Sequence, residues 1–213
     1  MATATSTWTK KTAVIGIAML ALNARTSGQI DLSGKRGALI TVFAMRSGAT
    51  AVATGVQARI RRLHGSATPY LHSATVASFN GGVVTAVSGV AEDSGSPNPA
   101  GATSLTIDAA KTYAAGSNGD IMLGIIDDTT TPTLASEIVR QVSATSTTVK
   151  LLEYPLESAH NNVAHVVADQ AELWTAWVEG GSRVEVAISY ISATGDSLCV
   201  GAYADTYDSD NIV

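Results

Sequence analysis

The sequence is short of several residue types, and each shortage excludes a class of protein. It holds one cysteine, Cys199, which rules out an intramolecular disulfide and a cysteine-based zinc cluster. Charged residues make up 15% of the chain, whereas an average soluble domain has roughly a quarter. The formal net charge of -5 is acidic, and proteins that wrap nucleic acid carry a basic surplus, so we expect no nucleic-acid partner. Because the chain has no disulfide and no cysteine-based zinc cluster, its stability must come from packing or from assembly.

Long hydrophobic runs are missing as well. Lys10 and Lys11 precede the apolar segment Ala13–Leu22, an order that imitates a secretory signal peptide. The segment is too short to span a bilayer and Asn23 interrupts its cleavage-like end, so we interpret it as a buried strand and expect no membrane partner. Alternating threonines before it predict an extended polar arm over residues 1–12. The mean hydropathy of +0.20 is high for so few charges and favours a surface buried against other chains.

The chain is rich in short Val, Ile and Thr runs separated by turn-forming residues, and helical periodicity is scarce. This pattern is typical of an all-β protein. In residues 38–46 both alternating sets of side chains are apolar or small, which predicts burial on both faces. The predicted strands span 14–22, 38–46, 56–63, 75–79, 83–90, 104–108, 120–126, 137–142, 147–152, 163–167, 172–178, 183–191 and 197–204.

The distribution of turn formers divides these strands into two groups. Residues 92–102, with two prolines, are the predicted linker. Residues 103–168 have enough short strands for a compact, barrel-like module, whereas the last three strands are too few to be stable alone. We therefore predict a β-sandwich, jelly-roll or immunoglobulin-like, made from residues 1–91 and 169–213, with the module inserted in one of its loops. A simple string of two domains is the alternative.

Three motifs resemble chemical sites without meeting their requirements. Residues 93–97 (DSGSP) are similar to the nucleophile segment of serine proteases, but the flanking glycines and a general-base motif are missing. Gly28–Lys35 approximates a phosphate-binding loop with the wrong spacing, so we interpret it as a turn between strands. We expect no enzyme, cofactor or metal site, since no known metal site has the spacing of Asp127, Asp128, Glu157, His160 and His165.

Arginines form the first group of candidate interface residues: Arg46, Arg59, Arg61 and Arg62, with Arg140 further along. An arginine row on a strand can bind carboxylates of a partner through two parallel hydrogen bonds. The alternative is a solvated strand face whose charge discourages edge-to-edge pairing.

Tryptophans form the second group. Trp174 and Trp177 lie on opposite faces of one predicted strand, so at most one of them belongs to the core and the other is an interface candidate. Trp8 lies in the polar arm, where anchoring on a neighbouring subunit and folding back on its own domain both remain open.

Several strand-and-turn segments resemble structural proteins of tailed-bacteriophage virions. They are LNA at 22–24, IDLSG at 30–34, VQARIRR at 56–62, SLTID at 104–108, GDI at 119–121, EIVRQV at 137–142, TVKL at 148–151 and PL at 155–156 with His160. The resemblance implies a non-catalytic protein that works through its surfaces. We expect a capsid decoration or cement protein, made in the host cytoplasm and located on the virion.

The resemblance also implies the partners. These are the major capsid protein or other virion proteins, and further copies of the chain in a dimer or trimer. The alternative is a collar, tail or baseplate component that uses the module as a docking platform. A carbohydrate-binding module is disfavoured by the 5% aromatic content. A hydrolase is disfavoured because no convergent acid, base and nucleophile is evident.

Overall fold

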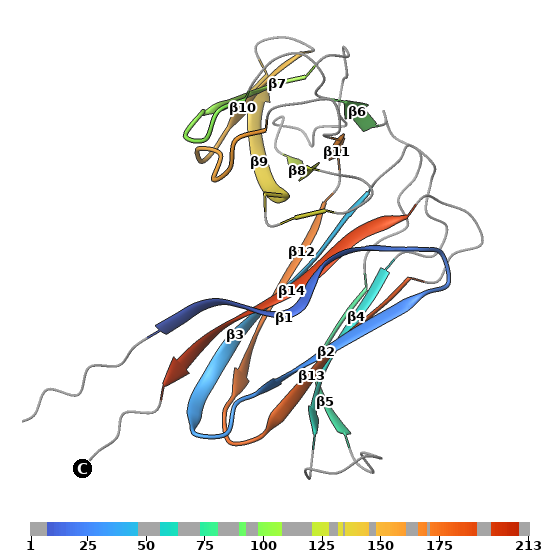
Figure 1. The fold of residues 1–213 in the computed structure, drawn as a ribbon, viewed down its shortest axis with the longest axis vertical. Coiled ribbons are helices and arrows are strands. Elements are labelled where there is room, and N and C mark those ends of the chain that lie inside the picture. The colour runs from blue at the N-terminus through green and yellow to red at the C-terminus, as the bar shows by residue number, and fades with distance from the viewer. Residues whose placement is uncertain are drawn as a thin grey trace, which may run out of the picture.

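The structure is a computed structural model that describes residues 8–46, 56–63, 73–80, 90–92, 98–107, 121–127, 132–133, 135–144, 148–160, 166–169, 171–190 and 197–208. These residues form fourteen β-strands and no helix, which confirms the predicted all-β class (Figure 1). Eight strands build a sandwich and six build a module at one of its ends.

The sandwich strands are β1 (Trp8–Leu20), β2 (Arg25–Asp31), β3 (Lys35–Arg46), β4 (Val56–Leu63), β5 (Ser73–Asn80), β12 (Glu172–Glu179), β13 (Arg183–Tyr190) and β14 (Leu198–Asp208). One sheet has the order β1-β14-β3-β12 and the other β2-β13-β4-β5, with antiparallel neighbours throughout. Counted along the chain without the inserted strands, these orders are 1-8-3-6 and 2-7-4-5, the connectivity of a jelly roll. The structure thereby decides between the two predicted types of sandwich.

The sandwich core follows from alternation along the strands. On β4, Ala58 and Ile60 are fully buried while the intervening Arg59 is exposed, as the sequence predicted. Ile40 and Val42 of β3 face them from the opposite sheet in the same apolar cluster. Side chains of both sheets thus meet in one interior layer, as two stacked sheets require.

β2 is a strand that the sequence did not predict. Its residues RTSGQID lack an apolar alternation, and Gly28–Lys35 was expected to be a turn. In the structure residues 28–31 continue β2, and the turn to β3 lies at residues 32–34. Pairing with β13 along its whole length holds β2 in the sheet, so tertiary contacts override its weak propensity.

The module enters after β5 and the chain returns to the sandwich at β12. Phe79, near the end of β5, stacks on Trp174, near the start of β12, with ring centroids 5.8 Å apart and an interplanar angle of 13°. The end of β5 and the start of β12 therefore lie close together. An insertion whose two ends lie close together adds little to the entropy cost of loop closure, so a long insertion is tolerated there.

The module strands are β6 (Val90–Glu92), β7 (Ser104–Thr106), β8 (Ile121–Ile126), β9 (Glu137–Ala144), β10 (Val149–Leu152) and β11 (Val166–Asp169). They form one antiparallel sheet in the order β6-β11-β8-β9-β10-β7. Among the described strands β6 and β7 are the two edges, so the expected barrel-like closure is not seen there. Leu105, Ile107, Leu123 and Ile125 are buried in the module's own apolar cluster.

The module is longer than the predicted 103–168, because its sheet runs from Val90 to Asp169. Part of the predicted linker, residues 92–102, belongs to it. Asn98 is buried, its backbone bridges to His160, and its side-chain amide exchanges two hydrogen bonds with the backbone of Thr106, at 2.9 and 2.8 Å. Residues 93–97, with the protease-like motif, and most of the strand predicted at 83–90 lie outside the described residues.

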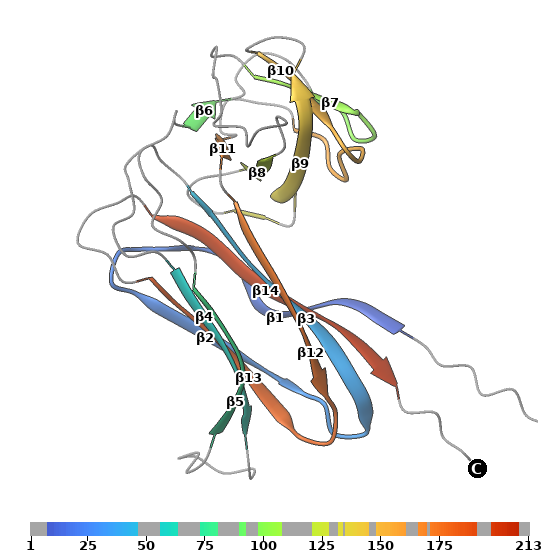
Figure 2. The same ribbon diagram turned by 180° about the vertical axis from the view of Figure 1, so that it is seen from behind.

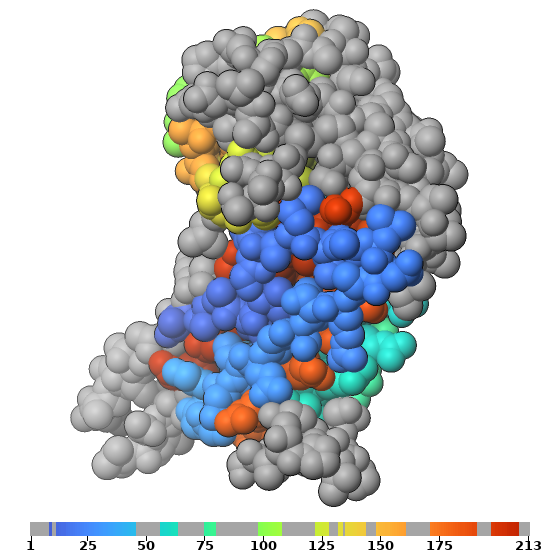
Figure 3. Space-filling model, turned by 45° about the vertical axis from the view of Figure 1, so that its right-hand side comes forward, coloured from blue at the N-terminus to red at the C-terminus, as the bar shows by residue number. Residues whose placement is uncertain are grey.

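A third apolar cluster joins the module to the sandwich. Phe43 and Met45 of β3 and Cys199 of β14 point away from the sandwich core and pack against Ile126 and Ala171. The prediction that both faces of residues 38–46 are buried therefore holds for the end nearest the module. Figure 2 shows the module over this end of the sandwich, and in Figure 3 its yellow atoms rest on the blue atoms of β1.

Close contact between β1 and β2 makes Gly28 a sensitive position. A Cβ atom there would lie 1.7 Å from the carbonyl oxygen of Val14, whereas a Cβ at Gly16 meets nothing within 4 Å. We expect Gly28→Ala to lower the free energy of unfolding by about 3 kcal/mol or more, at the upper end of overpacking effects. Gly16→Ala, the control, should change it by less than about 0.5 kcal/mol. Urea unfolding of both variants measures this, and equal effects would contradict the close approach.

Candidate functional site

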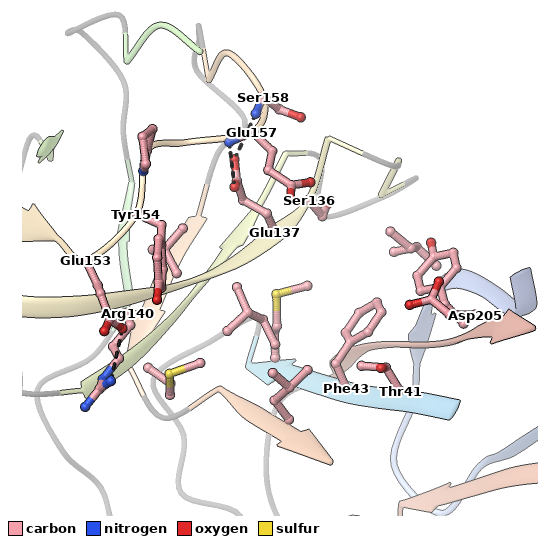
Figure 4. Close-up of a pocket in the computed structure, with 18 residues that line it drawn as sticks. Thr41, Phe43, Ser136, Glu137, Arg140, Glu153, Tyr154, Glu157, Ser158 and Asp205 are labelled. Carbon is pink, nitrogen blue, oxygen red and sulfur yellow. Dashed lines mark hydrogen bonds and ion pairs between the residues drawn. The ribbon is translucent and has the colours of Figure 1, made fainter. Parts of the chain in front are cut away.

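An open groove of about 760 Å³ lies between the module and the outer face of the β1-β14-β3-β12 sheet (Figure 4). Strands from both parts of the chain supply its walls. The floor is apolar, and its side chains are those of Ile17, Phe43, Met45, Met122, Ile138 and Leu173. The rim is polar and comes from β9, β14 and residues 153–158. An apolar floor inside a polar rim is the usual construction of a binding surface.

Phe43 sets the shape of the groove floor. Its ring lies over Gly201 of β14, where a Cβ atom would be 2.5 Å from the ring's Cζ atom. The ring also stacks on Tyr203, with centroids 6.1 Å apart and an interplanar angle of 12°. Because Gly201 has no side chain, the aromatic rings of neighbouring strands can lie along the sheet and leave space above them.

Glu137 organises the rim on the module side. Its carboxylate accepts hydrogen bonds from the backbone N–H groups of Glu157 (3.0 Å) and Ser158 (3.2 Å), and it lies 2.7 Å from Nε2 of the buried His160. Burial opposes ionisation of Glu137, but the hydrogen bonds from His160 and the two N–H groups outweigh it and lower its pKa. Glu137 therefore fixes residues 157–160 against β9.

Further along the same wall the rim becomes exposed. Arg140 and Glu153 form an ion pair at 3.0 Å, and the adjacent Tyr154 is 70% exposed. The lining contains four carboxylates, Glu137, Glu153, Glu157 and Asp205, against the single guanidinium of Arg140. The groove is thus acidic as well as apolar, which suits a partner segment that carries basic and apolar side chains.

The predicted metal-ligand candidates have other contacts. Asp127 accepts a hydrogen bond from the N–H of Thr133 at 2.9 Å and binds the hydroxyls of Thr133 and Ser136, so it holds these two residues at the end of β8. His160 is bound to Glu137. Asp128 and His165 lie outside the described residues. Within the described part of the chain no three His, Cys, Asp or Glu side chains are grouped as metal ligands.

The candidate arginines do not form one row. Arg59 is exposed on the outer face of the β2-β13-β4-β5 sheet, and beside it Arg61 lies 3.8 Å from Glu185. Arg62 instead donates to the carbonyl oxygens of Glu179 (3.1 Å) and Gly180 (3.4 Å) and so ties β4 to the turn after β12. Arg46 lies in the other sheet, with its backbone opposite Leu198. Interface roles for Arg59 and Arg61 stay predictions.

The tryptophans of β12 lie on opposite faces, as predicted. Trp174 packs against the sandwich core, whereas Trp177 is 45% exposed on the outer face. The Trp177 ring lies over Gly37, where a Cβ atom would be 2.3 Å from its Cζ2 atom. Leu173, on the same face, is 46% exposed and was not a predicted site residue, although strand alternation from Trp177 places it there.

Trp8 begins β1 and does not belong to a free arm. Its backbone lies opposite Tyr207 of β14. The predicted arm over residues 1–12 is therefore too long, since residues 8–12 are part of a strand. The side chain of Trp8 lies outside the described part of the structure, so its interface role stays a prediction.

Replacement of Glu137 tests its role in shaping the groove. We expect Glu137→Gln to lower the free energy of unfolding at pH 7 by about 1 to 2 kcal/mol, because hydrogen bonds to a charged acceptor are lost. Since the pKa is lowered in the folded state, the carboxylate's contribution is complete above its ordinary value of 4.5 and disappears as the pH falls through the folded-state pKa. The variant should lack this acid-dependent loss.

Urea unfolding between neutral and acidic pH measures both effects. Glu153→Gln is the control, since its ion pair with Arg140 is largely exposed and worth little. An acid-dependent loss of the same size in Glu137→Gln and the unmodified chain would contradict the assignment.

Comparison with known proteins assigns neither a family nor a function to the chain. No family model, no curated protein and no solved structure matches it. The described residues also contain no helix long and apolar enough to cross a membrane. A function must therefore be argued from the chain's own surfaces.

Proposed function

We propose that this chain is a structural protein of a tailed-bacteriophage virion, acting as a capsid decoration or cement protein that binds the major capsid protein and other copies of itself. The observation that carries the proposal is the acidic, apolar-floored groove between module and sandwich. Leu173 of β12, which is part of this floor, is 46% exposed. Exposed apolar surface bordered by polar groups is characteristic of protein-binding sites.

The fold is compatible with this proposal without deciding it. Jelly rolls occur in viral capsid proteins, and also in lectins and cupins. Function belongs to the site and not to the fold. The groove favours a protein partner because its two walls come from two structural units and because its rim is polar and exposed around an apolar floor.

A cement protein stabilises the capsid because its binding is thermodynamically linked to capsid assembly. A subunit that binds the assembled capsid and not its separated subunits stabilises the assembly by mass action. Contact at more than one site strengthens the effect, because the second contact is made at a high effective concentration. A groove for the capsid together with a surface for a second copy provides such contacts.

Tyr154 on the groove rim is the residue with which to test capsid binding. It is 70% exposed, so Tyr154→Ala should leave folding unchanged. We expect the variant to bind heads stripped of this protein about tenfold more weakly, since exposed tyrosines often anchor interfaces. Val142→Ala, an exposed apolar position outside the groove lining, is the control and should bind normally. Cosedimentation with heads measures both, and equal binding by both variants would exclude the groove.

Copy number in purified particles tests the location. For a cement protein we expect near-stoichiometric amounts relative to the major capsid protein, and heads that fail at lower temperature after the protein is stripped. Quantitative gel densitometry and imaging of particles measure this. A count of a few rings would support the collar, tail or baseplate alternative, and absence from particles would exclude a virion role.

A further inference from the structure

β12 is an edge strand that presents an apolar outer face. It pairs with β3 over all eight residues, and no other described strand lies along its second edge (Figure 2). On its outer face Leu173 and Trp177 are 46% and 45% exposed, with Thr175 exposed between them. An exposed edge strand offers a row of backbone hydrogen-bonding groups to another chain.

Among the described residues, β12 shows few of the features that usually protect such an edge. Its sequence ELWTAWVE contains no proline, lysine or arginine, and its pairing with β3 has no register shift. Long, flat, apolar edges are rare in proteins that stay monomeric, because they promote pairing between chains.

The other edge strands of the sandwich are protected. β1 has three register shifts against β14. β5 has a register shift against β4. β2 exposes mainly polar side chains, those of Arg25, Ser27, Gln29 and Asp31. Among the four edges, β12 is therefore the one suited to pairing.

The spacing of the apolar residues on β12 identifies a matching partner. Leu173 and Trp177 lie two residues on either side of Thr175. In an antiparallel pair, directly opposite residues lie on the same face of the sheet. If two β12 strands pair antiparallel with Thr175 opposite Thr175, each Leu173 lies opposite Trp177 of the second copy. Such a cross-strand pair of an aromatic and an aliphatic side chain is stabilising.

We propose that two copies of this chain form a two-fold symmetric dimer through antiparallel pairing of their β12 strands, with Thr175 at the symmetry axis. The two four-stranded sheets then form one continuous eight-stranded sheet, and its outer face buries Leu173 and Trp177 of both copies. The dimer makes specific the self-association part of the proposed function.

The charges of β12 are compatible with this register. Its two carboxylates, Glu172 and Glu179, lie at its ends. With Thr175 at the axis, Glu172 is opposite Val178 of the second copy, and Glu179 is opposite Ala171. In this register no two carboxylates of β12 face each other directly. Like charges in directly opposite positions would destabilise the strand pair.

The first experiment measures the mass of the purified full-length chain by sedimentation velocity. We expect a species of twice the chain mass of 21.8 kDa at micromolar concentration. Thr175→Lys should weaken the dimer by about a hundredfold or more in Kd, because it places two ammonium groups together at the axis. Ser27→Lys, a matched change of a small exposed hydroxyl residue on the edge strand β2, should leave the dimer intact.

The second experiment tests the register by disulfide trapping. Directly opposite Cα atoms are about 4.5 to 5.5 Å apart, within the reach of a disulfide. Thr175→Cys should therefore cross-link two copies on mild oxidation. Glu179→Cys should not, because its two copies lie roughly 26 Å apart along the strands at about 3.3 Å per residue. Cys199 does not interfere, since it is buried and burial, with the nearby Asp127, raises its pKa to about 12.

Several outcomes would overturn the proposal. These are a monomer at all concentrations, a dimer or trimer that Thr175→Lys leaves intact, and Glu179→Cys cross-linking as readily as Thr175→Cys. A chain that stays monomeric alone, binds a capsid protein and loses that binding in Thr175→Lys would show that β12 pairs with a different chain. Failure of the dimer is distinguishable from failure of the virion role, because the chain can be monomeric in solution and still be counted on particles.

Discussion

The apolar outer face of β3 and β14 at the module end is the constraint on which the rest of the structure depends. A jelly roll needs only the inner faces of its sheets to be apolar, yet Phe43, Met45 and Cys199 lie on an outer face and are nearly or fully buried. The module supplies the cover through Ile126 and its neighbours. Because this contact fixes the module over one end of the sheet, the remaining outer face becomes a groove with two walls.

The groove and β12 divide the exposed apolar surface between two tasks. The groove has a concave floor and an acidic rim, which suit a segment of a different protein. β12 has a straight edge and a symmetric pair of apolar side chains, which suit an identical strand. Leu173 belongs to both surfaces, since it lines the groove and lies on the edge strand. Binding at one surface is therefore expected to influence the other through this side chain.

Much of the fold was predictable from the sequence because alternation is a local signal. The buried Ala58 and Ile60 and the opposite faces of Trp174 and Trp177 followed from a period of two. The inserted module followed from the distribution of turn-forming residues. β2 did not, because its residues are polar and its strand conformation depends on pairing with β13. The choice of a jelly roll also required pairings between distant strands, which single-sequence patterns do not contain.

The candidate site was less predictable for the same reason. Glu137 and His160 meet across 23 residues, and the groove joins side chains as distant as Ile17 and Tyr203. No local motif marks such contacts.

The position of β1 and β14 at opposite ends of the sequence has a consequence for synthesis. Among the described strands, β1 has β14 as its neighbour in the sheet, so residues 8–20 find their partner when residues 198–208 emerge from the ribosome. The module's strands, by contrast, all lie between residues 90 and 169 and pair with one another. The module can thus be complete while the jelly roll around it is still open, and closure of the sandwich is a late step set by its long-range pairings.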